Sequence, residues 1–355
     1  MTTIQAETYP IHFNENCNTE INSYLKNSDH SQIYVVVDEN THQYCLSQFL
    51  ATIETKIAIE IIEIEAGESH KNIETCMGVW NALSELGADR KSLVINLGGG
   101  TITDLGGFVA STFRRGIKYI NVPTTLLSMV DASIGGKTGV DLNGLKNQIG
   151  VINTPEMVLI NTTFLNTLPT NEMRSGLAEM FKHALISNYQ CWHRLNGLPK
   201  LTLEDLDSLI HESILIKKTI VEQDPTEEGL RKTLNFGHTL GHAIETYCLT
   251  ESDKESLLHG EAIAVGMILA CYLSKELFGF PEQMCNEVKN TLQKYFGKIH
   301  FNTEDQIKII ELLKYDKKNT YGNINFVLLE NIGKPLFDQK VSNRLIIKAF
   351  NYYAI

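Results

Sequence analysis

The chain is 355 residues long, which exceeds what one compact core usually holds, so we expect two domains. Its formal net charge is −11 and it has no basic tract, which argues against nucleic-acid binding because phosphate contacts need clustered lysines and arginines. Seven scattered cysteines without Cys-x-x-Cys pairs indicate a reducing compartment, and neither a signal-peptide core at residues 1–13 nor a bilayer-length apolar run is found, so we expect a cytoplasmic protein without membrane partners.

The first part of the chain alternates short β-branched strands with helical stretches. We expect strands at residues 33–37, 56–65, 92–97 and 117–122, and helices at residues 70–86 and 103–113. Strands and helices that alternate in this way are typical of a parallel sheet with helices on both faces. We therefore predict an α/β domain at residues 1–161.

From residue 162 onward the pattern becomes helical. We expect helices at about residues 171–188, 204–222, 229–249, 259–278, 282–296 and 304–314. A strand pair is expected at residues 316–329 with its turn at residues 321–323, and a last helix from residue 341. We therefore predict a mostly helical second domain at residues 162–355, and a ligand site in the cleft between the domains.

Three glycines, Gly98 to Gly100, follow the strand at residues 92–97 and precede the helix expected next. Glycine lets the backbone approach a pyrophosphate, and the free N–H groups of a helix N-terminus bind anions. The segment lacks the Gly-x-Gly-x-x-Gly pattern, so a tight turn without a ligand is the alternative. Asp38, at the end of an earlier strand, is either a ribose-binding carboxylate or a turn-forming residue.

A second glycine-rich segment carries Lys137, Lys146 and Asn147 and shows neither a helical nor a strand period. Gly135-Gly136-Lys137-Thr138 resembles the end of a P-loop, but Asp131 occupies the position of the required first glycine, which excludes a nucleoside triphosphatase site. The segment then either binds a small anion through backbone N–H groups and lysines, or forms a solvated surface loop.

His238 and His242 lie four residues apart, which places both imidazoles on one face of a helix. His259 follows, and upstream Glu179 and Lys182 lie three residues apart on another expected helix. Two histidines and one carboxylate, with a coordination position left open, form a common type of catalytic zinc site. Spacing favours His238 with His242 as the metal ligands, but it does not decide among the three histidines.

Gly237 and Gly241 are also four residues apart. Each glycine costs about 1 kcal/mol relative to alanine inside a helix, so two of them need a reason. We expect a neighbouring helix or a ligand to approach closely at these positions.

Taken together, these residues resemble the 3-dehydroquinate synthase family. The resemblance runs from residues 38–40 to residues 316–318. Its most specific segments, all in the family's order, are Gly98-Gly99-Gly100 with Asp104, Arg115-Gly116, residues 123–127, residues 131–137, Lys146-Asn147, residues 175–179, residues 235–239 and residues 259–261. Two departures stand out: Arg114 occupies a position where methionine is common, and the segment between His242 and His259 is a few residues longer.

The resemblance implies a role for each matching residue. Zinc or cobalt would be held by Glu179, His238 and His259, and His242 would instead be an acid–base residue together with Glu227. An NAD site would be formed by Asp38, Asn40, Glu68, Lys71, Gly99, Gly100, Thr101, Asp104, Thr124, Thr125, Lys137 and Lys146. A substrate site would be formed by Arg115, Asp131, Lys137, Asn147, Lys182, Lys217, Arg231, Asn235 and one of the pair Lys317 and Lys318.

The resemblance also implies a Rossmann-like NAD-binding domain followed by a helical domain, in a homodimer. The implied reaction converts 3-deoxy-D-arabino-heptulosonate 7-phosphate into 3-dehydroquinate and phosphate, a step of the shikimate pathway to chorismate and the aromatic amino acids. Its stages are transient oxidation with NAD, phosphate elimination, reduction and intramolecular aldol closure, with the metal as Lewis acid.

Three alternatives follow from the same residues. Another sugar-phosphate cyclase would keep the NAD and metal residues and differ around the substrate. A metal-dependent polyol dehydrogenase would share the glycine turn and the two-domain plan but release NADH stoichiometrically. A ligand-binding regulator that has lost its chemistry is disfavoured, because every expected acid, base and ligand type is present.

Overall fold

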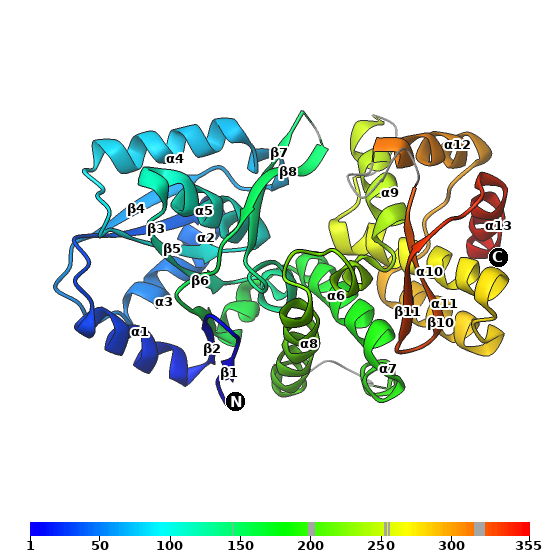
Figure 1. Cartoon of the computed structure of the whole chain (residues 1–355), viewed down its shortest axis with the longest axis horizontal. Coiled ribbons are helices and arrows are strands. Elements are labelled where there is room, and N and C mark those ends of the chain that lie inside the picture. Colours follow the sequence, from blue (N-terminus) through cyan, green and yellow to red (C-terminus); the bar gives the residue numbers. More distant parts are fainter. Residues whose placement is uncertain (144, 198–202, 252–253, 255, 316–323) are drawn as a thin grey trace. The chain divides into compact units, whose positions relative to one another are not determined.

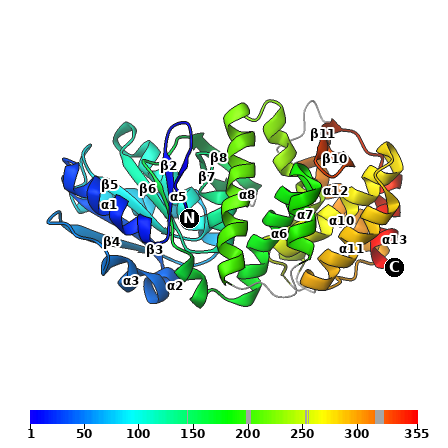
Figure 2. The same cartoon turned by 90° about the horizontal axis from the view of Figure 1, so that it is seen from below.

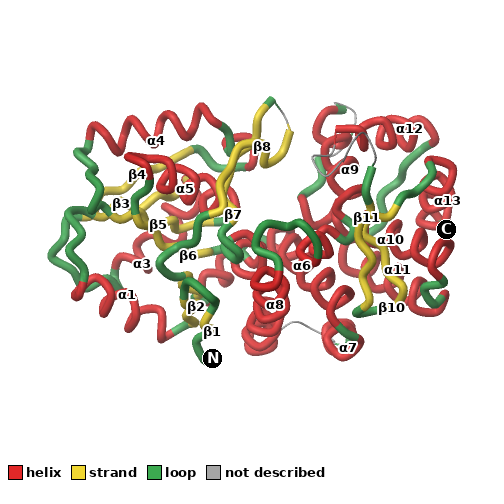
Figure 3. The backbone as a smooth tube through the Cα atoms, viewed as in Figure 1, coloured by secondary structure: helices red, strands yellow, loops and turns green. Residues whose placement is uncertain are grey.

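The structure is a computed structural model of the chain, and it describes residues 1–143, 145–197, 203–251, 254, 256–315 and 324–355. The chain divides into two units. Unit 1 comprises Met1–Pro169 and Leu203–Lys218, and unit 2 comprises Thr170–Thr202 and Thr219–Ile355. Figure 3 shows that unit 1 holds the large sheet, whereas unit 2 is mostly helical.

Unit 1 is built on a mostly parallel sheet. Among the described residues this sheet has seven strands in the order β1-β2-β9-β6-β5-β3-β4, and only the β1–β2 pair is antiparallel. The strands are β1 (Ile4–Gln5), β2 (Pro10–Phe13), β3 (Ile33–Asp38), β4 (Ile59–Ile64), β5 (Leu93–Gly98), β6 (Lys118–Pro123) and β9 (Val158–Ile160). The first five residues of β3 are buried in an unbroken apolar run, as expected for a strand that is covered on both faces.

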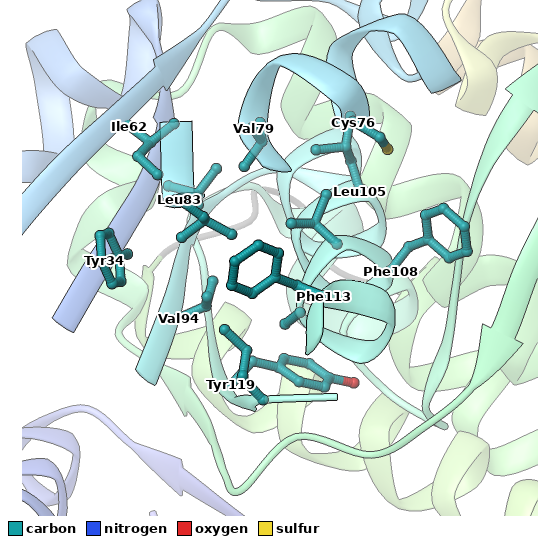
Figure 4. Close-up of a cluster of buried hydrophobic side chains, with 14 of the residues drawn as sticks. Tyr34, Ile62, Cys76, Val79, Leu83, Val94, Leu105, Phe108, Phe113 and Tyr119 are labelled. Carbon is teal, nitrogen blue, oxygen red and sulfur yellow. The ribbon is translucent and has the colours of Figure 1, made fainter. Parts of the chain in front are cut away.

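Helices cover both faces of this sheet, with α4 and α5 on one side and α1 and α3 on the other (Figure 1). The helices of unit 1 are α1 (Glu15–Asn27), α2 (Glu39–Thr41), α3 (Ser47–Leu50), α4 (Ile73–Glu85) and α5 (Gly100–Thr112), joined by the first part of α8 (Leu203–Gln223). One core cluster packs side chains of α4 and α5 against the sheet, and Figure 4 shows Val79 and Leu105 facing Val94 across it. The predicted α/β organisation of the first part of the chain is therefore confirmed.

A strand pair occupies the glycine-rich segment in which the sequence shows no period. There β7 (Lys137–Leu142) pairs antiparallel with β8 (Leu145–Ile152), so the expectation of an irregular segment was wrong. The pairing sets Gly139 opposite Gly150, and a Cβ atom added at Gly139 would lie 2.5 Å from the Ile149 carbonyl oxygen. Glycines that admit a neighbouring backbone conceal the alternation that usually marks a strand.

In the residues that the structure describes, unit 2 is a set of helices with one strand pair. Its elements are α6 (Thr170–Ser187), α7 (Tyr189–Asn196), the end of α8, α9 (His238–Thr250), α10 (His259–Phe278), α11 (Glu282–Phe296), α12 (Thr303–Leu312), β10 (Phe326–Asn331), β11 (Lys334–Gln339) and α13 (Asn343–Ala354). Helix α10 is apolar on nearly all sides and packs against α6, α9, α11, α13 and β10, so it is the centre of this unit (Figure 2). Within the described part of the chain, no helix has both the length and the apolar character needed to cross a bilayer.

Two expectations about unit 2 were wrong in detail. The helix expected at residues 229–249 is broken at Gly237, whose φ of +79° separates a 3₁₀ segment, Leu230–Asn235, from α9. The strand pair lies later than predicted and turns at Gly333, with a φ of +77°, because this glycine supplies the turn conformation. The turn expected at residues 321–323 lies outside the described residues.

Glycines bring the backbones of α9 and α10 into direct contact. A Cβ atom added at Gly266 would lie 2.0 Å from the Gly237 carbonyl oxygen, and one added at Gly241 would lie 3.1 Å from the Ile263 Cα. At the start of α10, a Cβ atom on Gly260 would lie 2.3 Å from the Ser175 Cα of α6. A neighbouring helix, one of the two expected reasons for Gly237 and Gly241, is therefore confirmed.

We predict that Gly266→Ala lowers the free energy of unfolding by about 1–3 kcal/mol or more, because the added methyl forces two backbones apart. The control is Gly78→Ala on an exposed face of α4, where nothing lies within 4 Å of the added atom. That change should raise stability by up to about 1 kcal/mol. Urea unfolding of both variants measures the difference, and equal stabilities would contradict the packing argument.

Candidate functional site

A carboxylate and two imidazoles from three helices of unit 2 converge on one point. Glu179 lies in the middle of α6, His238 is the first residue of α9, and His259 is the first residue of α10. The Oε1 atom of Glu179 lies 3.4 Å from His238 Nε2 and 3.6 Å from His259 Nε2, and the Glu179 side chain is fully buried. These three atoms are donors of the kind that divalent zinc or cobalt prefers.

His242 belongs to the same cluster. Its ring centroid lies 5.2 Å from that of His238 and 5.7 Å from that of His259, and the three histidines have nitrogen atoms within 4.8 Å of one another. The structure therefore brings together both the pair favoured by spacing and the set implied by the resemblance.

The far nitrogens of His238 and His259 distinguish these two rings. His238 Nδ1 lies 3.1 Å from the Phe236 carbonyl oxygen, and His259 Nδ1 lies 3.3 Å from Glu245 Oε2. Because these oxygens only accept, each Nδ1 carries the proton and each Nε2 lone pair faces Glu179. Metal-ligating histidines typically show this arrangement, so Glu179, His238 and His259 fit a metal.

Lys182 adds a positive charge to the buried centre. It lies one turn after Glu179 on α6, forms an ion pair with the Glu179 carboxylate, and is 1% exposed. Burial of either charge alone would be strongly unfavourable, so the pair must be treated as a unit.

The segment that leads from α8 to α9 gathers three further predicted residues. Asn235 Nδ2 donates to Glu227 Oε1 at 2.7 Å, and Arg231, which is 3% exposed, donates from Nη1 to the Pro225 carbonyl oxygen at 2.6 Å. Glu227 has a φ of +65°, which is unusual for a residue other than glycine. The structure thus places Glu227 and Asn235 in contact, with Arg231 anchored in the same turn.

Asp224 fixes that turn and was missed from the sequence. Its carboxylate accepts the backbone N–H groups of Glu228 at 3.0 Å, Gly229 at 2.8 Å and Arg231 at 2.9 Å. Although burial acts in the opposite direction, these donors lower the pKa of Asp224 below its ordinary value. An aspartate followed by proline at the end of a long helical stretch is a turn signal, and it points to this position.

In unit 1, the predicted cofactor residues follow the carboxyl ends of neighbouring parallel strands. Asp38 ends β3, Gly98 ends β5, and Thr124 and Thr125 follow β6, with Gly98 paired to Pro123 in register. This edge is where open parallel sheets bind ligands. Asp38 also accepts the Thr41 N–H at 2.7 Å and so caps the helix that carries Asn40.

The glycine turn after β5 is shaped by its neighbours. A Cβ atom added at Gly99 would lie 3.1 Å from Thr125 Cγ2, and Gly100 is the first residue of α5. The free N–H groups of this helix start therefore lie beside the residues that follow β6, which suits a bound phosphate.

Five of the predicted cofactor residues form one polar network. Lys71 Nζ lies 3.1 Å from Glu68 Oε1 and 3.2 Å from Asp104 Oδ2. Thr101 Oγ1 donates to Glu68 Oε2 at 3.0 Å, and Lys146 Nζ lies 3.5 Å from Glu68 Oε1. Residues separated by up to 78 positions in the sequence are thereby brought together in unit 1, from Glu68 to Lys146.

The pKa values of the two carboxylates of this network are shifted in opposite directions. Burial raises the pKa of Asp104 to about 6, although the Lys71 ammonium opposes the shift. Burial also acts to raise the pKa of Glu68, but the charges of Lys71 and Lys146 outweigh it and lower that pKa to about 2. Glu68 therefore stays ionised over the range around pH 6 in which Asp104 titrates.

The remaining predicted substrate residues lie in separate places. Lys217 Nζ donates to Asp131 Oδ1 at 2.7 Å within unit 1, and the Asn147 N–H donates to Asp141 Oδ1 at 2.7 Å. Lys137 is the first residue of β7, and Arg115 is exposed in a left-handed turn with a φ of +70°. Lys317 and Lys318 lie outside the described residues.

Both parts of the chain match one family. Residues 61–175 match the family model for the 3-dehydroquinate synthase N-terminal region, and residues 176–319 match the model for the C-terminal region. The chain is 40% identical to a 3-dehydroquinate synthase from Parabacteroides distasonis over 337 residues, which cover 94% of this chain and 95% of that protein.

Two solved structures share the whole fold. A 2-deoxy-scyllo-inosose synthase solved with carbaglucose-6-phosphate, NAD⁺ and Co²⁺ is 25% identical with a TM-score of 0.85, and the match covers 99% of each chain. A 2-epi-5-epi-valiolone synthase from Streptomyces hygroscopicus subsp. jinggangensis, solved with NAD⁺ and Zn²⁺, is 25% identical with a TM-score of 0.86, covering 100% of this chain and 99% of that one. With both of its regions matched and 40% identity across nearly its full length, the chain belongs to the 3-dehydroquinate synthase family.

Proposed function

We propose that this chain converts 3-deoxy-D-arabino-heptulosonate 7-phosphate into 3-dehydroquinate and inorganic phosphate, in the shikimate pathway to chorismate and the aromatic amino acids. The observation that carries the proposal is the convergence of Glu179 Oε1 with the Nε2 atoms of His238 and His259, in a chain that is 40% identical to a synthase of this name. The overall conversion removes phosphate and closes a carbon ring without net oxidation.

NAD and a divalent ion, zinc or cobalt, are the proposed cofactors. Glu179, His238 and His259 would hold the ion. The polar network around Lys71, the Gly99–Gly100 turn and the residues after β3 and β6 would hold the dinucleotide. When bound, the nicotinamide ring supplies a reversible hydride acceptor and the ion supplies a Lewis acid.

The substrate carries a carboxylate and a phosphate, and the chain supplies cations for both. Arg115, Lys137, Lys182, Lys217, Arg231 and one of Lys317 and Lys318 are the proposed set, with Asp131, Asn147 and Asn235 as polar contacts. Arginine holds such groups with two parallel hydrogen bonds, whereas lysine acts as a compact charge. Arg231 is anchored through Pro225, which leaves its guanidinium in a fixed orientation.

His242 and Glu227 are the proposed acid–base residues. His242 lies one turn after His238 on α9 and can therefore exchange protons beside the metal residues. Glu227 is oriented by the Asn235 amide, which donates to its Oε1.

The setting of the protein is also a proposal. We propose that it acts in the cytoplasm as a homodimer, without nucleic-acid or membrane partners. All seven cysteines are buried and unbridged, which suits a reducing compartment, and the acidic balance of −11 disfavours phosphate polymers.

The identities favour the dehydroquinate reaction over other sugar-phosphate cyclases. The two cyclases of other specificity are 25% identical to this chain, compared with 40% for the synthase from Parabacteroides distasonis. A polyol dehydrogenase would accumulate NADH, so the measurement of NADH distinguishes it from the proposed synthase.

The activity is tested by incubating the full chain with NAD⁺, Zn²⁺ or Co²⁺ and the heptulosonate phosphate. We expect stoichiometric release of phosphate and formation of 3-dehydroquinate, with no net NADH. Net NADH from glycerol or another polyol, without phosphate release from the heptulosonate, would refute the proposal.

The metal assignment predicts opposite behaviour for two neighbouring histidines. His259→Ala removes a ligand, so elemental analysis should find the bound metal lost. His242→Ala should retain the metal and lose turnover by about 100-fold or more, as expected for an acid–base residue. Metal loss in His242→Ala with retention in His259→Ala would show that the pair favoured by spacing is the ligand pair.

The cofactor assignment predicts a pH dependence of NAD⁺ binding. Because the pKa of Asp104 is raised to about 6, its carboxylate is charged above that pH and is neutralised as the pH falls through it. Loss of this charge beside Lys71 should weaken NAD⁺ binding, by at most about tenfold per pH unit for one proton. Calorimetric titration between pH 5 and 8 measures the effect.

Two variants serve as controls for this pH dependence. Asp104→Asn should bind NAD⁺ more weakly and without the change near pH 6. Glu68→Gln should retain a change but move it to lower pH, because the charge of Glu68 contributes to the raised pKa of Asp104, whereas Glu68 itself, with a pKa of about 2, does not titrate in this range. A parent protein whose NAD⁺ affinity is constant from pH 5 to 8 would remove Asp104 from the site.

A further inference from the structure

Glu245 contacts His259, one of the proposed metal ligands, at the ring nitrogen that does not face Glu179. Its Oε2 atom lies 3.3 Å from His259 Nδ1, on the side of the ring opposite to the Nε2 atom that faces Glu179 at 3.6 Å. Glu245 lies on α9, seven residues after His238 and three after His242, so two helical turns carry all three side chains.

The groups that accept hydrogen bonds from the Nδ1 atoms of His238 and His259 differ in charge. His238 Nδ1 is held by the carbonyl oxygen of Phe236, a neutral backbone acceptor, whereas His259 Nδ1 is held by a carboxylate. An ionised acceptor forms a stronger hydrogen bond and makes the opposite nitrogen a better electron donor.

Burial of Glu245 calls for such a partner. The residue is 8% exposed, and an ionised carboxylate is expensive to bury unless it is paired. Asp305 shows the structural use of a buried carboxylate in the same unit, since it accepts the Tyr247 hydroxyl at 2.6 Å and the Lys254 ammonium at 2.9 Å. Glu245 instead contacts a histidine whose other nitrogen faces Glu179.

We propose that Glu245 is a positioning residue for the metal ion. It accepts the Nδ1–H of His259, which holds that ring in the tautomer whose Nε2 is unprotonated and fixes its orientation. The inference rests on the proposed metal site and adds to it a residue that sets the affinity of the protein for the ion. Removal of such a partner typically weakens metal binding by about 10–100-fold.

The test measures the affinity of the metal-free full chain for Zn²⁺ by competition with a chromophoric chelator. Glu245→Ala should raise the dissociation constant about 10–100-fold, and Glu245→Gln should raise it less, because an amide oxygen still accepts but carries no charge. NAD⁺ affinity and the melting temperature of the metal-free Gln variant should match those of the parent. The visible absorption of Co²⁺ bound to the same variants reports the change in ligand geometry.

Glu287→Gln is the matched control. Glu287 is a carboxylate in the same unit that accepts the Trp192 indole N–H at 2.7 Å and the Asn196 amide at 3.1 Å, two groups that are not proposed metal ligands. Its substitution should leave the Zn²⁺ affinity unchanged. An equal loss in both glutamine variants would show a general effect of losing a carboxylate and would overturn the inference.

The remaining outcomes also decide. A Zn²⁺ affinity of Glu245→Ala within about twofold of the parent overturns the inference, and if that variant does not fold, the same criterion applies to Glu245→Gln. Failure of the parent to bind Zn²⁺ overturns it as well. If the parent binds Zn²⁺ more tightly than the Glu245 variants but releases no phosphate, the proposed reaction is contradicted and this inference stands.

Discussion

The contact between helix backbones in unit 2 is the constraint on which the metal residues depend. Glu179, His238 and His259 come from three helices, and their atoms meet only because α10 lies against both α9 and α6 without intervening side chains. Gly241 and Gly266 make the first contact possible and Gly260 the second. Because His238 and His259 are each the first residue of a helix, the position of the helix fixes the position of the imidazole.

In both units, a buried lysine pairs with carboxylates of the candidate site. In unit 1, Lys71 contacts Glu68 and Asp104 at once, so one ammonium serves two carboxylates and leaves one of them with a raised pKa. In unit 2, Lys182 pairs with the buried Glu179. Such networks hold their members in one geometry, and removal of a single member leaves the others uncompensated.

Regular elements with strong patterns could be predicted from the sequence. The helices at residues 259–278 and 282–296 match α10 and α11, and the β-branched run at residues 33–37 matches β3 to within one residue. The pair β7–β8 could not be predicted, because glycines replace the alternating side chains where the two backbones meet. Local patterning cannot reveal a contact that depends on a second segment of the chain.

The candidate site was predictable in its residue types but not in its connections. The spacing of His238 and His242 indicated a metal site. The rings that fit the metal are distinguished by the oxygen atoms that contact their Nδ1 atoms, the Phe236 carbonyl for His238 and the Glu245 carboxylate for His259, and the spacing does not reveal these contacts. Asp224 acts through three backbone N–H groups, which no side-chain pattern displays. Glu245 lies two turns after His238 on α9, but its contact with His259 depends on the packing of α10 against α9.

Each of the two histidines begins a helix, so its position depends on the packing of that helix and not on the length of the connection between α9 and α10. Helix α9 ends at Thr250 and α10 begins at His259, so residues 251–258 connect two elements whose positions are set elsewhere. We therefore expect changes in the length of this connection to leave both imidazoles in place. What fixes each imidazole is the helix start that carries it, with Gly237 directly before His238 and Gly260 directly after His259, and not the interval between the two histidines.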